Sequence, residues 1–148
     1  MNAPPKRRSF TKAERLAVYE KTNGHCAYCG AEIEMRQMQV DHVISIEFPD
    51  SSNDLINLLP ACRSCNNYKS TFSIEKFREM IERWPSVLMR DSVTFRNAVR
   101  FGMVEPDFEK RITFYFEDIG IEIAPNPIDD MYREHLERKR REAESCRD

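Results

Sequence analysis

The sequence predicts a small α+β domain flanked by further helices, and three features of its 148 residues indicate this fold. Two Cys-x-x-Cys pairs enclose a run of alternating apolar and polar residues that is typical of a β-hairpin. Stretches with the apolar spacing of a helix lie on both sides of this run. The length fits about one domain, and no apolar run is long enough to span a membrane.

The first half of the chain contains the predicted core elements. We expect a helix over residues 10–21, a hairpin with arms 31–35 and 38–46, a loop over 47–56 and a helix from the second cysteine pair to about residue 69. Thr11 and Glu14 have the spacing of a capping box, and Gly24 can end the first helix. The core is therefore expected to contain two strands followed by a helix.

Beyond the core, the sequence predicts helices and a short strand pair. We expect a helix capped by Ser73, a helix over 87–100, a strand over 111–117 and a charged helix from about residue 129. Helical spacing places Phe77, Ile81 and Trp84 on one buried face. We therefore divide the chain into a flexible basic arm (1–9), a core (10–72), a helical and strand extension (73–124) and a charged helical tail (125–148).

Four of the five cysteines form two close pairs, Cys26 with Cys29 and Cys62 with Cys65. The N-terminal residues lack the apolar core of a secretory signal, so an extracellular disulfide framework is not expected. Two such pairs predict one tetrahedral, structural Zn²⁺ site with four thiolate ligands. A thioredoxin-like redox pair would need a single Cys-x-x-Cys in a βαβ setting. Cys146 has no evident partner in the sequence.

Between and beside the cysteine pairs lie residues suited to metal-assisted cleavage of a phosphodiester. His42 can take a proton from water near neutral pH. Asp41 and Asn66 offer the carboxylate and amide oxygens that Mg²⁺ or Mn²⁺ prefers. A surface Asp-His pair and, for Asn66, a helix cap are the plainer interpretations. Consecutive side chains on a flat strand face opposite sides, so Asp41 and His42 can share a site only where the strand ends, twists or bulges.

These residues resemble a known family, the HNH endonucleases, which have a ββα-metal core. The resemblance is carried by Cys-Ala-Tyr-Cys-Gly, then Val-Asp-His-Val-Ile, then Asn-Leu-Leu-Pro-Ala-Cys-Arg-Ser-Cys-Asn-Asn-Tyr-Lys, within about residues 19–72. It implies that His42 is the general base, that Asp41 is a ligand of a catalytic Mg²⁺ or Mn²⁺, and that Asn57 braces the loop and helps to aim His42. The last motif letter falls at Asn66, where the commonest form of the family has histidine.

The same resemblance has two further implications. Lys69 matches a frequent lysine of the family and is implied to touch a phosphate, while a solvated helix residue is the alternative. The longer sequence context is similar to small HNH proteins of phages and prophages. This similarity implies a bacterial or phage-encoded cytoplasmic protein, with phage or prophage machinery as a partner.

The distribution of charge supports DNA as the partner. The net charge is −2, but residues 1–30 and residues 62–100 each contain four more basic than acidic side chains. These blocks, with Arg63 and Lys69, could form a face that binds phosphates, although solvated helix faces are the alternative. The sequence therefore predicts a metal-dependent endonuclease that hydrolyses DNA phosphodiester bonds. A zinc-dependent nucleic-acid-binding module without catalysis and an accessory protein of a phage packaging machine are the alternatives.

Overall fold

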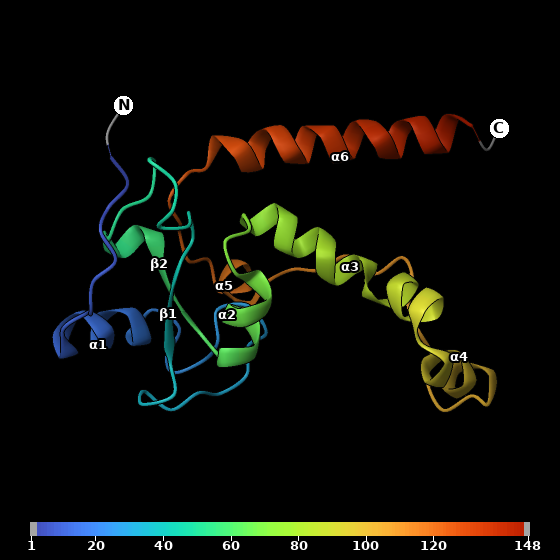
Figure 1. The fold of residues 1–148 in the computed structure, drawn as a ribbon, viewed down its shortest axis with the longest axis horizontal. Coiled ribbons are helices and arrows are strands. Elements are labelled where there is room, and N and C mark those ends of the chain that lie inside the picture. The colour runs from blue at the N-terminus through green and yellow to red at the C-terminus, as the bar shows by residue number, and fades with distance from the viewer. Residues whose placement is uncertain (1–2, 147–148) are drawn as a thin grey trace.

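The structure, a computed structural model, describes residues 3–146. Its elements are α1 (Lys12–Glu20), β1 (Gln39–His42), the 3₁₀ helix η1 (Leu55–Asn57), β2 (Leu58–Ala61), α2 (Arg63–Lys69), α3 (Ile74–Asp91), α4 (Val93–Arg100), α5 (Tyr115–Asp118) and α6 (Pro127–Ser145). Figure 1 shows α1, the two strands and α2 gathered at one end, with α3 leading away to α4 and α6 running beside α3. No helix among residues 3–146 is long and apolar enough to cross a bilayer.

The first helix begins with the predicted capping box. The Thr11 hydroxyl accepts a hydrogen bond from the Glu14 amide at 3.2 Å, and the Glu14 carboxylate accepts one from the Thr11 amide at 2.7 Å. These bonds satisfy two amides that the start of a helix would otherwise leave without partners. On the inner face of α1, Val18 is fully buried and packs with Met38 and Leu58. The helix therefore covers the strand pair.

The predicted hairpin between residues 31–35 and 38–46 is wrong. β1 pairs antiparallel with β2 across the loop that precedes the second cysteine pair. Residues 31–35 instead fold back on the first pair, where the Cys26 amide donates a hydrogen bond to the Ala31 carbonyl at 2.8 Å. Alternation in the sequence cannot choose the partner of a strand, because contacts remote along the chain decide the pairing.

The helix predicted from Ser73 is confirmed as α3, whereas the single helix predicted over residues 87–100 is wrong, because α3 continues to Asp91 and α4 begins only at Val93. The Ser73 and Ser92 hydroxyls each accept a hydrogen bond from the amide three residues later, and so cap α3 and α4. Phe77 is buried as expected, at 1% exposure, whereas Trp84 is 37% exposed. Trp84 differs from its predicted place in the core because α3 extends away from the strand pair (Figure 1).

The predicted strand over residues 111–117, and with it the short strand pair of the extension, is wrong. Within residues 3–146 the structure has a single sheet, formed by β1 and β2, and α5 stands where the strand was expected. The alternation does identify the inward side chains, since Phe114 and Phe116 are both buried. The Phe116 amide bonds to the Ala27 carbonyl at 2.8 Å, so this segment pairs with the first cysteine turn and not with a strand.

One hydrophobic cluster joins the core to the extension. Its buried members come from the first cysteine pair, the strand region, α3 and the segment around α5: Cys26, Ala27, Tyr28, Val43, Leu59, Ala61, Ile74, Phe77, Phe114 and Phe116. The predicted boundary between residues 72 and 73 therefore crosses continuous packing.

Ion pairs attach α6 to α3. Arg133 lies 3.2 Å from Glu75, and Arg140 lies 3.6 Å from Glu82. The Asp129 carboxylate also accepts a hydrogen bond from the Glu75 amide at 3.0 Å, beside the start of α3. The charged helix predicted from about residue 129 is thus present and is anchored along one side.

Candidate active site and metal centre

The structure brings the four paired cysteines together. Their sulfur atoms all lie within 4.8 Å of one another, and Sγ of Cys29 is 3.9 Å from Sγ of Cys62. An ion with metal–sulfur bonds of about 2.3 Å in a tetrahedral arrangement would hold its ligands about 3.8 Å apart. The four side chains therefore fit a single metal ion.

The crowding of these thiols favours a cation among them. A hydrogen bond from Cys65 lowers the pKa of Cys26 to about 5, and the same contact raises the pKa of Cys65. One thiol ionises readily because its neighbour keeps a proton. Four thiolates at these distances would repel one another, and a bound cation would remove that repulsion.

A polar cleft of about 440 Å³ lies between β1 and α2. Asp41 and His42 from β1 and Asn66 from α2 line it, so the structure brings three of the predicted site residues together. The remaining lining residues are Arg7, Val40, Ser45, Ile46, Asn67, Ser70 and Thr71. β1 ends at His42, and both Asp41 and His42 line the cleft although they are consecutive in the chain.

Two residues outside the predicted set hold the His42 ring. Nε2 of His42 lies 2.9 Å from Oδ1 of Asn53, in the loop between the strands. The Phe10 ring packs against the imidazole, with the ring centroids 5.9 Å apart. With Nε2–H donating to Asn53, Nδ1 is the nitrogen that can accept a proton.

Asn57 lies inside the loop and not in the cleft. Its side chain is 1% exposed, and its Oδ1 accepts a hydrogen bond from the Ile44 amide at 2.8 Å. Its Nδ2 donates to the Ser52 carbonyl at 2.9 Å and to the Ser51 hydroxyl at 3.2 Å. The amide thus ties both ends of the loop together just after His42, a geometry that suits the predicted bracing role.

Asp41 is held by two buried donors. The Tyr28 hydroxyl donates a hydrogen bond to Oδ2 of Asp41 at 2.5 Å, and Nζ of Lys69 lies 3.1 Å from the same oxygen. Lys69 also donates to the His42 carbonyl at 2.9 Å. Burial raises the pKa of Asp41, while the charge of Lys69 and the bond from Tyr28 act in the opposite direction.

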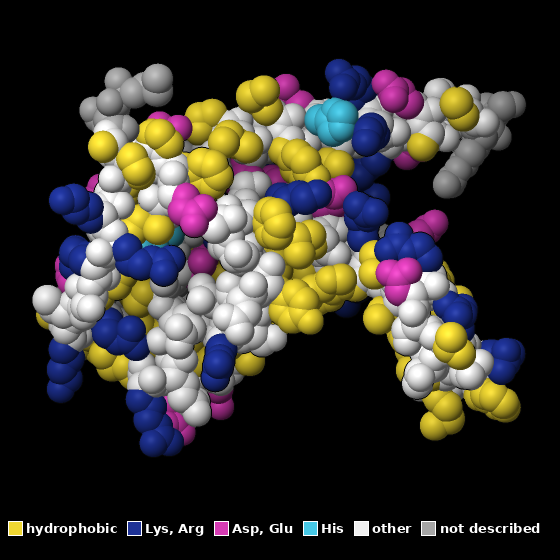
Figure 2. Space-filling view, in the orientation of Figure 1, with side chains coloured by type: hydrophobic (Ala, Val, Ile, Leu, Met, Phe, Trp, Pro, Cys, Tyr) yellow, Lys and Arg dark blue, Asp and Glu magenta, His cyan; other side chains and the backbone are white. Residues whose placement is uncertain are grey.

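The placement of Lys69 differs from the sequence expectation of a phosphate contact. Its side chain is fully buried, because its ammonium group pairs with Asp41 inside the fold. Arg63 is exposed at the start of α2. The cation that lines the cleft is Arg7, from the N-terminal arm. Figure 2 shows Lys and Arg side chains spread over the visible face, among acidic and uncharged side chains.

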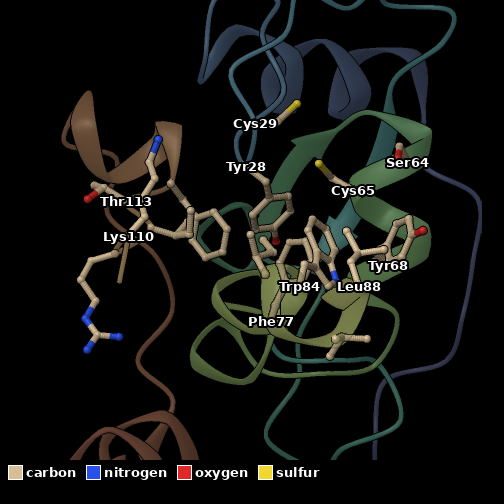
Figure 3. A pocket seen from close by; sticks show the side chains of 15 residues that line it. Tyr28, Cys29, Ser64, Cys65, Tyr68, Phe77, Trp84, Leu88, Lys110 and Thr113 are labelled. Atoms are coloured by element: carbon tan, nitrogen blue, oxygen red, sulfur yellow. The ribbon is translucent and has the colours of Figure 1, made fainter. Parts of the chain in front are cut away.

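A second, largely apolar groove of about 660 Å³ lies on the other side of α2 (Figure 3). Ser64, Cys65 and Tyr68 face this groove, whereas Asn66, Asn67 and Ser70 face the polar cleft. The helical period of 100° per residue places these two sets on opposite faces of α2. The helix therefore separates an apolar groove from the polar candidate site.

Three residues that contact the site were not assigned to it from the sequence: Phe10, Tyr28 and Asn53. Arg7, in the cleft itself, was expected only as part of the basic arm, with a phosphate contact and an ordinary tail as the two interpretations. Phe10, Asn53 and Arg7 carry no distinctive spacing relative to His42. Tyr28 lies between two paired cysteines, but nothing in the sequence indicates that its hydroxyl reaches Asp41.

The fold and the site together define the class of the domain: an antiparallel strand pair followed by a helix, with an Asp-His pair at a strand end and a four-cysteine cluster. Residues 26–72 match the HNH endonuclease family. The chain carries an HNH endonuclease domain.

Individual relatives share this part of the chain. The Septu protein PtuB of Bacillus thuringiensis is 34% identical over 65 residues, which are 42% of this chain and 25% of PtuB. The SPbeta prophage-derived protein YoqL of Bacillus subtilis is 28% identical over 86 residues, which are 49% of this chain and 34% of YoqL. Cas9 of Actinomyces naeslundii is 38% identical over 56 residues, which are 38% of this chain and 5% of Cas9.

A crystal structure of the type II-C Cas9 enzyme from Actinomyces naeslundii matches 51% of this chain and 9% of that chain, with a TM-score of 0.44 and 28% identity. The chain spans between a twentieth and a third of the length of the curated relatives named above.

Proposed function

We propose that this chain is a metal-dependent endonuclease that hydrolyses phosphodiester bonds of DNA, by nicking or by cutting both strands. The observation that supports this proposal most directly is the convergence of Asp41, His42 and Asn66 on one polar cleft. The match of residues 26–72 to the HNH endonuclease family supports it independently.

In the proposed reaction, Nδ1 of His42 takes a proton from a water molecule as the water oxygen attacks phosphorus. The bond from phosphorus to the 3′ oxygen breaks, and this oxygen takes a proton from solvent, so the products are a 5′-phosphate and a 3′-hydroxyl. A Mg²⁺ or Mn²⁺ ion held by Asp41 and the Asn66 amide oxygen would supply charge stabilisation. Asn53 and Phe10 keep the imidazole oriented, and Arg7 offers the cleft a positive charge for the substrate.

In the same proposal, Cys26, Cys29, Cys62 and Cys65 bind a structural Zn²⁺. The sulfur spacing and the two Cys-x-x-Cys turns suit this ion. The zinc would hold the turn at Tyr28 next to the start of α2, and so keep the two walls of the cleft together.

A plasmid assay tests the activity. Supercoiled plasmid incubated with the full chain and Mg²⁺ or Mn²⁺ is expected to become nicked or linear, and His42→Ala is expected to lower the rate at least a hundredfold. His135→Ala, at a half-buried histidine on α6 that does not line the cleft, is the matched control and should cut as the unmodified chain does. Equal cutting by His42→Ala would contradict the proposed mechanism.

One observation favours a second function, a zinc-dependent DNA-binding module without catalysis. The charge of Asp41 is already paired with Lys69, and an amide stands at the last motif letter, so the cleft would attract a second metal ion less strongly. A salt-dependent gel shift without cutting in any divalent metal would support this alternative. The prophage origin of YoqL supports phage or prophage machinery as a proposed setting for either function.

A further inference from the structure

Tyr28 lies in the first cysteine turn and reaches across the core to the cleft. Its side chain is 3% exposed, and its hydroxyl donates a hydrogen bond to Oδ2 of Asp41. The residue thereby connects the turn that holds Cys26 and Cys29 directly to a residue that lines the candidate active site.

The two donors around Asp41 both use one of its oxygens. The Tyr28 hydroxyl and the Lys69 ammonium group both contact Oδ2. Within residues 3–146, no buried side-chain nitrogen or oxygen lacks a hydrogen-bond partner. Oδ1 of Asp41 has no donor among these residues, so it is the oxygen that is open to the cleft. The Asp41 carboxylate is therefore fixed with Oδ2 bonded inside the fold and Oδ1 facing the cleft.

The Tyr28 ring is in turn enclosed by the extension. Three phenylalanine rings meet it edge-on: Phe77 of α3 at 5.4 Å, Phe114 at 5.3 Å and Phe116 at 6.2 Å between centroids. The Tyr115 amide also bonds to the Tyr28 carbonyl at 3.1 Å. Figure 3 shows Tyr28 between the cysteine sulfurs and Phe77. All three rings lie outside residues 26–72, the part of the chain that matches the HNH family.

We propose that Tyr28 is a positioning residue for the divalent metal ion of the cleft. With Lys69 it locks Asp41 so that a single oxygen, Oδ1, is presented as a ligand, and the extension (73–124) in turn locks Tyr28. This proposal rests on the proposed function, because it assigns Asp41 to a metal ion in the cleft. A ligand already held in its bound orientation loses less conformational freedom when the metal binds.

Tyr28→Phe tests the proposal, because it removes the hydroxyl and keeps the ring and its packing. Mn²⁺ binding to the zinc-loaded full chain, measured by calorimetry without DNA, is expected to weaken about tenfold. The zinc content should stay unchanged, and saturating Mn²⁺ should restore most of the cutting rate. Tyr68→Phe is the matched control, since Tyr68 is 55% exposed in the apolar groove, and its Mn²⁺ affinity should equal that of the unmodified chain.

A second variant tests the role of the extension. Phe116→Leu loosens the enclosure of Tyr28 at a position outside the HNH match and should also weaken Mn²⁺ binding, by about threefold, while zinc is retained. An unchanged Mn²⁺ affinity in Tyr28→Phe would overturn the proposal. The proposal would also be overturned if Tyr28→Phe lost zinc and its folded structure together with its Mn²⁺ affinity.

The two levels of proposal fail in different ways. If Mn²⁺ binds the unmodified chain, and Asp41→Asn weakens that binding while Tyr28→Phe does not, then the positioning role alone is wrong. If the unmodified chain binds no Mn²⁺ in the cleft, or if Asp41→Asn leaves binding unchanged, then the proposed metal site and the positioning role are both wrong.

Discussion

The ammonium group of Lys69 lies 3.1 Å from Oδ2 of Asp41, and both side chains are shielded from solvent. A buried ion pair of this kind is costly to break by removing one partner, because the remaining charge is left without compensation. The pair joins the end of β1 to the end of α2, the two elements that form the walls of the candidate active site.

Removing the cation of this pair should destabilise the fold. Lys69→Met is expected to lower the free energy of unfolding by about 3–5 kcal/mol, because it leaves the Asp41 carboxylate buried without its counterion. Urea unfolding of the zinc-loaded protein measures this change. Lys12→Met, at an exposed lysine of α1, should change the free energy by less than about 0.5 kcal/mol. Equal effects of the two substitutions would show that the buried pair is not formed in solution.

The orientation of the general base should depend on Asn53. Asn53→Ala removes the partner of Nε2 of His42 and is expected to slow plasmid nicking by about tenfold to a hundredfold, since the imidazole would no longer be held in one orientation and tautomer. Asn97→Ala, on α4, is the control and should leave the rate unchanged. A rate for Asn53→Ala equal to that of the control would show that Phe10 and the backbone are sufficient to hold the ring.

Contact with DNA phosphate is expected from Arg7. Arg7→Gln should weaken DNA binding and reduce the slope of log K against log salt by about one, because one phosphate contact is lost. Titration of a labelled duplex at several salt concentrations measures both quantities. Arg36→Gln, at an exposed arginine in the turn before β1, should leave the slope unchanged. If both variants behave like the unmodified chain, Arg7 has no role in binding.

The four-cysteine cluster should be required for the fold. Cys26→Ser is expected to reduce the metal content well below one ion per chain and to lower the melting temperature, because the ion joins segments that are remote in sequence. Elemental analysis and thermal unfolding report the two effects. Cys146→Ser is the control, since Cys146 is exposed at the end of α6. Full metal content in Cys26→Ser would rule out the cluster as the site.

Acid should weaken the ion pair between Glu75 of α3 and Arg133, which attaches α6 to α3. Burial raises the pKa of Glu75, but the ion pairs with Arg78 and Arg133 outweigh burial, so the pKa is lowered in the folded chain. The stabilisation from this carboxylate is therefore complete above its unfolded pKa of about 4.3 and is lost as the pH falls through the lower folded value.

Urea unfolding of the unmodified chain and of Glu75→Gln at pH 7 and pH 3.5 tests this expectation. The difference in stability between the two proteins should be largest at pH 7 and should shrink at pH 3.5. The loss of thiolate-bound metal in acid affects both proteins alike, so it cancels in the comparison. A difference that does not change with pH would show that the charge of Glu75 contributes nothing.

Local patterns in the sequence predicted the features that depend on a few neighbouring residues. The Thr11 capping box and the Ser73 cap follow from rules that act over three or four positions. The spacing of the cysteines was sufficient to predict that they converge, because two residues between ligands allow both sulfurs to face one ion. Asp41, His42 and Asn66 were proposed from their side-chain chemistry, and the resemblance to a known motif added Asn57.

Only the tertiary structure decided the features that depend on which distant segments meet. β1 pairs with β2 and not with residues 31–35, because the partner of a strand is chosen by packing on both of its faces. Lys69 faces inward because a carboxylate from another element lies within reach, which no property of the helix itself reveals. The contact of Tyr28 with Asp41 also depends on the tertiary structure. A polar side chain can be buried only where the fold supplies a hydrogen-bond partner for it.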